Sequence, residues 1–116
     1  MESGKGIRVE GNINILGNLS YFLQLKPIIN GDYWNGISCS KNSIVSFNYV
    51  NVTGTSGDAF KLSDVNNANF NNVYINGISG NGISWESSQV FGKAKFQFLT
   101  VGALEQGNKA VVMETK

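Results

Sequence analysis

The feature of this sequence that most constrains its fold is an internal repeat with a period of about 23 residues. Three segments with the same order of residue types begin at this interval: Asn35-Gly-Ile-Ser-Cys39, Asp58-Ala-Phe-Lys-Leu62 and Asn81-Gly-Ile-Ser-Trp85. The same interval relates Phe47 to Phe70. Self-similarity at a fixed period of this size is typical of solenoids, in which each repeat forms one coil that stacks on the next.

Short runs of alternating apolar and polar residues fill most of each repeat. Examples are Val50-Asn-Val52, Val73-Tyr-Ile75 and Phe96-Gln-Phe98, and this period of two is typical of β-strands with one buried face. Further copies of the repeat begin near Lys5 and at Asn108. We therefore expect an all-β fold: a right-handed parallel β-helix of about five coils, forming one domain over residues 1–116.

Equivalent residues of successive coils should lie above one another at the strand spacing of about 4.8 Å. The repeat then predicts an internal aromatic stack of Phe47, Phe70 and Phe96. It also predicts an internal row made of Ile37, Phe60, Ile83 and Ala110. Because Trp85 is equivalent to Cys39 and Leu62, we expect it to face the core.

A polar residue precedes the same strand in each coil, at Asn35, Asp58, Asn81 and Asn108. Short side chains of this kind tolerate tight backbone conformations and cap neighbouring amide groups. We expect a ladder at one corner, in which stacked side-chain amides hydrogen-bond along the axis of the solenoid.

Charge and residue usage exclude several classes of function. Nine Lys and Arg residues oppose eight Asp and Glu residues, which gives no charge pattern for nucleic acid, and no apolar run is long enough to insert into a membrane. Histidine is absent, and Cys39 is the single cysteine. A Ser-His triad and a multi-cysteine zinc site are therefore excluded, and we expect no cofactor and no bound metal.

The Asn- and Gly-rich coils over residues 5–113 resemble the pectate-lyase-like superfamily of right-handed β-helices, and are most similar to bacteriophage tailspikes and tail fibres. That resemblance implies that residues 1–116 are a fragment of a longer spike protein. It also implies a homotrimer on a virion tail, outside the host cell, that meets bacterial surface polysaccharide. Polygalacturonase-like members carry Gly-Asp-Asp and, one coil later, Gly-His-Gly-Ile-Ser. This chain has Gly57-Asp-Ala59 and Gly80-Asn-Gly-Ile-Ser84 instead, so that chemistry is not expected here.

The repeat also brings two carboxylates to neighbouring coils. Asp64 lies four residues after Phe60, and Glu86 lies three residues after Ile83. Two carboxyl groups roughly 5 to 9 Å apart are the catalytic pair of most glycoside hydrolases. A polysaccharide depolymerase, a hydrolase or lyase using Asp64 and Glu86, is thus the alternative function, while two solvated turn residues are the structural interpretation that we favour.

Aromatic residues favour carbohydrate binding without cleavage. Tyr33, Trp34, Tyr49 and Tyr74 are candidate platforms for the apolar faces of sugar rings. The leading hypothesis is a structural or receptor-binding segment of a tailspike or fibre that interacts with bacterial polysaccharide and is not itself an enzyme. An ice-binding solenoid would need Thr-x-Thr in successive coils, and only Thr53-Gly-Thr55 has this form.

Overall fold

The computed structural model shows a β-solenoid of about four turns, and it describes every residue except 1, 30, 41–42, 88–92 and 116. The described residues form strands, turns and bends but no helix. The ten strands are β1 (Ile7–Val9), β2 (Ile13–Leu16), β3 (Leu23–Leu25), β4 (Ile37–Ser40), β5 (Ile44–Thr53), β6 (Phe60–Ser63), β7 (Asn67–Asn76), β8 (Ile83–Ser87), β9 (Lys93–Val101) and β10 (Val111–Thr115).

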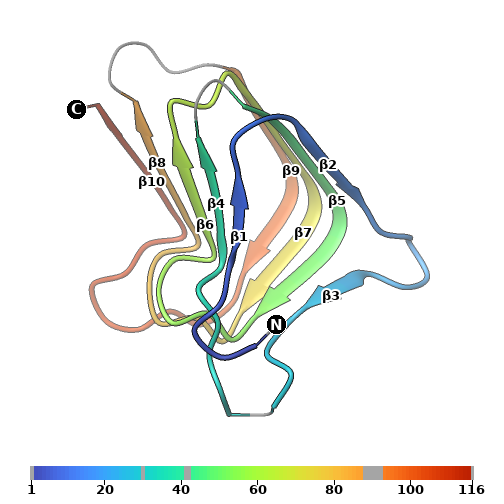
Figure 1. Ribbon diagram of the computed structural model, residues 1–116, viewed down its shortest axis with the longest axis vertical. Coiled ribbons are helices and arrows are strands. Elements are labelled where there is room, and N and C mark those ends of the chain that lie inside the picture. The colour runs from blue at the N-terminus through green and yellow to red at the C-terminus, as the bar shows by residue number, and fades with distance from the viewer. Residues whose placement is uncertain (1, 30, 41–42, 88–92, 116) are drawn as a thin grey trace.

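The strands form two parallel sheets that lie on opposite sides of the core (Figure 1). Sheet A has the order β1-β4-β6-β8-β10, and sheet B has the order β2-β5-β7-β9. β3 pairs with the second part of β5, on the edge whose first part pairs with β2. All the pairings are parallel. The all-β solenoid fold predicted from the repeat is confirmed, with about four turns rather than five and a mean spacing of about 26 residues, slightly longer than the sequence period.

The long strands of sheet B turn a corner at one residue. Tyr49 in β5, Asn72 in β7 and Phe98 in β9 have φ angles of 54°, 53° and 53°. The neighbouring residues pair in register across the three strands, so this left-handed conformation recurs at the same place in each coil. Asparagine adopts it readily. Tyrosine and phenylalanine do so seldom. Figure 1 shows the three strands bending together.

Inward-facing residues stack in rows along the axis. The aromatic stack is confirmed: Phe70 stacks on Phe47 with ring centroids 5.3 Å apart and on Phe96 at 5.5 Å. Phe47 and Phe70 are fully buried, whereas Phe96 ends the row and is 38% exposed. Phe60 packs edge-on against both Phe47 and Phe70, at 4.9 and 5.0 Å. Trp85 is fully buried, as expected.

One row of the prediction is wrong by one residue. Val111 pairs with Ile83, and Ala110 is exposed instead of continuing the row. The row is formed by Ile7, Ile37, Phe60, Ile83 and Val111. The last coil is longer than the repeat suggests, because the chain runs past Ala110 before it reaches the partner of Ile83.

The corner ladder forms, but with a different pattern of hydrogen bonds from the one expected. Asp58 Oδ1 accepts the backbone N–H of Asn81 at 2.7 Å, and Asn81 Oδ1 accepts the N–H of Lys109 at 2.8 Å. Asn108 donates from Nδ2 to the Ser79 carbonyl at 3.1 Å. The side chains therefore bind the backbone of neighbouring coils, which satisfies N–H and carbonyl groups that a tight corner leaves without strand partners.

Candidate functional site: the outer face of sheet A

The outer face of sheet A carries a continuous row of polar side chains. Arg8, Ser38, Lys61 and Ser84 occupy one register position on β1, β4, β6 and β8. Each alternates with residues that face the core, such as Ile37 and Cys39 on β4. A second row, two positions further along the strands, contains Ser40, Ser63, Glu86 and Glu114. We call these two rows the sheet A strip.

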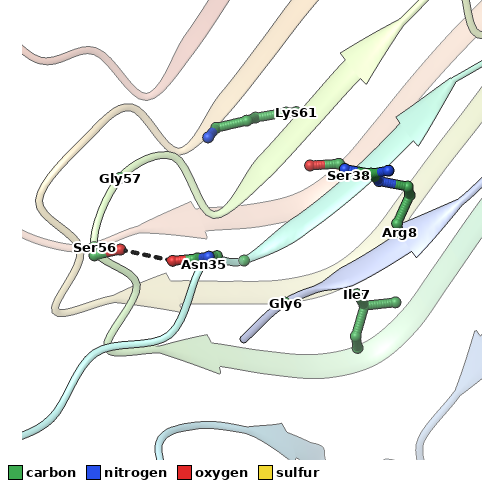
Figure 2. Close-up of a pocket in the computed structure, with 9 residues that line it drawn as sticks. Gly6, Ile7, Arg8, Asn35, Ser38, Ser56, Gly57 and Lys61 are labelled. Carbon is green, nitrogen blue, oxygen red and sulfur yellow. Dashed lines mark hydrogen bonds between the residues drawn. The ribbon is translucent and has the colours of Figure 1, made fainter. Parts of the chain in front are cut away.

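The first three strands of this strip border a hollow of about 410 Å³, which we call the basic hollow (Figure 2). Its polar side chains come from Arg8, Asn35, Ser38, Ser56 and Lys61. Figure 2 shows Ser38 between Lys61 on one side and Arg8 on the other. The small serine leaves space between the two long cationic side chains.

Hydrogen bonds fix the rim of the basic hollow. Asn35 donates from Nδ2 to the Gly4 carbonyl at 2.8 Å, and its Oδ1 accepts the hydroxyl of Ser56 at 3.2 Å. The backbone N–H of Ser56 donates to the Trp34 carbonyl at 2.8 Å. The amide and hydroxyl at this rim are thus positioned before any ligand arrives, which lowers the entropy cost of binding.

The other end of the strip is acidic. Glu86 on β8 is in register with Glu114 on β10. Glu86 and Asp58 border two depressions of about 240 and 260 Å³, the first shared with Glu114 and the second with Lys61. The sign of the charge therefore changes along the strip, from positive at β1 and β6 to negative at β8 and β10.

The predicted catalytic carboxylates lie on neighbouring coils. Asp64 follows β6 with a φ of 52°, and its backbone N–H donates to the Glu86 carbonyl at 3.0 Å. Ser63, rather than Asp64, is directly in register with Glu86. The carboxylates that share depressions with Glu86 are Asp58 and Glu114. A catalytic role for Asp64 and Glu86 stays a prediction.

Of the four predicted aromatic platforms, Trp34 has to be corrected. Its side chain is fully buried, and its Nε1 donates to the Thr53 carbonyl at 2.7 Å. A ring with no exposed face cannot stack on a sugar. Trp34 is therefore a core residue that ties one coil to the next.

The other three platforms retain exposed surface. Tyr33 is exposed and borders a cleft of about 290 Å³ with Pro27, Asp32 and Gly54. Tyr74 is exposed on the outer face of β7. Tyr49 is half-buried and packs edge-on against Phe22 with ring centroids 5.6 Å apart. Because these three rings lie on different parts of the coil, sugar binding by each stays a separate prediction.

Neither a metal nor a cysteine nucleophile has an evident place in the described residues. No group of three or more Cys, Asp or Glu side chains among them is arranged to hold a metal ion. Burial raises the pKa of the Cys39 thiol to about 12, whereas a reactive cysteine needs a lowered pKa. Cys39 is thus a core residue.

Sequence reasoning did not identify the basic hollow. Arg8 and Ser38 are separated by the same interval as Ile7 and Ile37 of the core row. Ser38 and Lys61 are separated by the same interval as Ile37 and Phe60. The signal was therefore present: applied to the polar positions as well, the repeat would have placed Arg8, Ser38 and Lys61 side by side.

The chain matches no model of a known protein family, no curated protein and no solved structure. The structure also holds no helix, within the residues it describes, that is long and apolar enough to cross a membrane.

Proposed function

We propose that this chain is a carbohydrate-binding segment of a bacteriophage tailspike or tail fibre, which attaches to bacterial surface polysaccharide through the sheet A strip. The observation that carries the proposal is the in-register row of Arg8, Ser38, Lys61 and Ser84. An extended polymer needs a long surface with repeated hydrogen-bonding groups. Strands stacked about 4.8 Å apart supply one such group per coil.

Two further features support a polysaccharide as the ligand. The basic hollow has a rim of amide and hydroxyl groups, which are the partners that sugar hydroxyls require. Tyr33 lies two residues before Asn35 of the basic hollow, and its exposed ring borders a separate cleft. Aromatic rings present an apolar face while polar groups around them fix the orientation of a ligand.

The test is binding of the purified chain to a panel of capsular and O-antigen polysaccharides from bacteria. We expect at least one polymer to bind and to keep its length. Ser38→Trp, which fills the strip, should weaken binding at least tenfold. Gln97→Trp places the same side chain on the exposed outer surface of β9 in sheet B and should leave binding unchanged. An equal loss of affinity in both variants, or no binding to any polymer, would contradict the proposal.

A homotrimer on the virion tail is part of this proposal. β9 and β10 each end a sheet, and the side chains there include Phe96, Phe98 and Met113, which are 38%, 71% and 47% exposed. Exposed strand edges and apolar residues of this kind favour association. Sedimentation should give a trimer at micromolar concentration, and a stable monomer would contradict this part of the proposal.

The alternative is a depolymerase that uses Asp64 and Glu86. What favours this function is that the two residues lie next to each other on neighbouring coils. The backbone N–H of Asp64 donates a hydrogen bond to the Glu86 carbonyl. Shortening of a bound polymer would select this function.

A further inference from the structure

We propose that the basic hollow binds an anionic group of the ligand, a carboxylate or phosphate oxyanion, between Arg8 and Lys61 with Ser38 as its floor. This inference rests on the proposed function, because it names the chemical class of polymer that the sheet A strip would take.

The composition of the hollow favours an anionic ligand. Nine residues line it, and among them are two cations, Arg8 and Lys61, and no acidic residue. The remaining polar side chains are Asn35, Ser38 and Ser56. Hydrogen-bond donors and positive charge gathered in a hollow favour an anion over a neutral group.

The spacing of the two cations suits one oxyanion between them. Arg8 and Lys61 are in register with Ser38 on either side of it. Two strand spacings put their Cα atoms roughly 9 to 10 Å apart. Long side chains on either side of a short hydroxyl leave room for one oxyanion, which the planar guanidinium of arginine can bind through two parallel hydrogen bonds.

The acidic end of the strip lies too far away to cancel the charge of Arg8. Glu86 is three strands from β1, or roughly 14 Å, which exceeds the Debye length of about 8 Å at physiological salt. Asp58 and Glu86 do border the depression on the far side of Lys61. Arg8 is therefore the main anion ligand, and Lys61 is the second.

Glu10 is the carboxylate nearest to Arg8 along the chain. It lies two residues further on, just after β1, or roughly 7 Å in an extended chain. Glu10 does not line the hollow. The lining of the hollow itself contains two cations and no acidic residue.

Gly57 gives a direct way to change the charge of the hollow. It lines the hollow, and a Cβ added there would meet no atom within 4 Å. Its φ is outside the left-handed region, so other residues fit its backbone. Gly57→Glu and Gly57→Lys should therefore fold equally well and differ by two charge units at the site.

The experiment measures binding of the chain to three soluble polymers: polygalacturonate, its carboxyl-reduced neutral form, and a glycerol-phosphate polymer. We expect at least tenfold tighter binding to one of the anionic polymers than to the neutral one, with added salt weakening it. The anionic polymer that binds more tightly identifies carboxylate or phosphate as the source.

Arg8→Gln and Lys61→Gln should each weaken binding roughly three- to tenfold, and Arg8→Lys should weaken it less. Gly57→Glu should weaken binding and Gly57→Lys strengthen it.

Lys95→Gln and Lys109→Gln are the matched controls, because they remove exposed cations that do not line the hollow, and they should change affinity less than twofold. Equal loss in these controls would indicate only a general charge effect and would overturn the inference. Equal binding of the neutral polymer would overturn it too, while leaving the proposed function intact. Failure of both anionic polymers to bind would also overturn the inference. The proposed function would then be decided separately by binding to the panel of bacterial polysaccharides.

Discussion

Phe47 and Phe70 are one full repeat apart in the chain, yet their rings stack with centroids 5.3 Å apart and planes inclined by 26°. Both rings are completely buried. The residue repeat is thus converted into direct side-chain contact along the axis of the solenoid. This contact is the basis of the core, because each apolar row is built from the same relationship.

Phe70→Ala tests the importance of this stack. Phe70 contacts the rings of Phe47, Phe60 and Phe96, and removing a buried aromatic side chain costs about 3 to 5 kcal/mol. We expect the free energy of unfolding, measured in urea, to fall by that amount. Tyr21→Ala is the control, because Tyr21 is 82% exposed and its removal should cost less than about 1 kcal/mol. Similar losses in both variants would show that the aromatic row does not dominate stability.

Gly36→Ala tests the close approach of two coils at the corner before β4. Gly36 has a φ of 78°, and an added Cβ would lie 2.5 Å from the Asp58 carbonyl oxygen. Backbone strain alone costs about 1 to 2 kcal/mol, and the clash with the next coil adds to it. We expect a loss of at least about 2 kcal/mol in the free energy of unfolding.

Gly57→Ala is the matched control for that change. It lies in the following coil, where an added Cβ meets no atom within 4 Å. Its stability should stay within about 0.5 kcal/mol of the wild type. Destabilisation by Gly57→Ala would mean that other atoms pack closely around Gly57, contrary to the open space in the structure.

Cys39 gives a prediction for alkaline pH. Burial raises its thiol pKa from 9.0 to about 12. The folded state therefore holds the proton more tightly than the unfolded state, so this contribution to stability is complete below about pH 9 and is lost as the pH rises toward 12. Stability should fall more steeply over this interval in the wild type than in Cys39→Ala, and the difference between the two isolates the contribution of the thiol.

Thiol reagents check the same residue independently. Native protein at neutral pH should react with a disulfide reagent only at the rate of unfolding, because Cys39 is 1% exposed. Fast labelling without denaturant would contradict the burial of Cys39.

The repeat predicted most of the fold because identical spacing places residues directly above one another. It predicted the pairing of Phe47 with Phe70 and the burial of Trp85, since both lie within coils of regular length. It placed Ala110 where Val111 belongs, because the last interval in sheet A is longer than the regular repeat. Alternating patterns also end at corners. Trp34 lies at such a corner, where its ring packs into the core and its Nε1 donates to the Thr53 carbonyl. No local pattern encodes this arrangement.

The candidate site was harder to predict than the core. Polar positions on the outer face are free to vary without loss of stability, so Arg8, Ser38 and Lys61 share no residue type that would reveal their alignment. Their relationship follows only after the apolar rows have set the register.

The last prediction decides between binding and cleavage. Hydrolysis by a carboxylate pair requires a general acid that stays protonated at working pH, which calls for a site that excludes water. Glu86 is half-buried at the edge of two depressions that open to solvent, and Asp64 is half-buried at the turn after β6. We therefore expect the chain to release no reducing ends from a polysaccharide that it binds, and Asp64→Asn and Glu86→Gln to leave polymer length unchanged. New reducing ends that disappear in both variants, with stability retained, would instead establish Asp64 and Glu86 as the catalytic pair of a depolymerase.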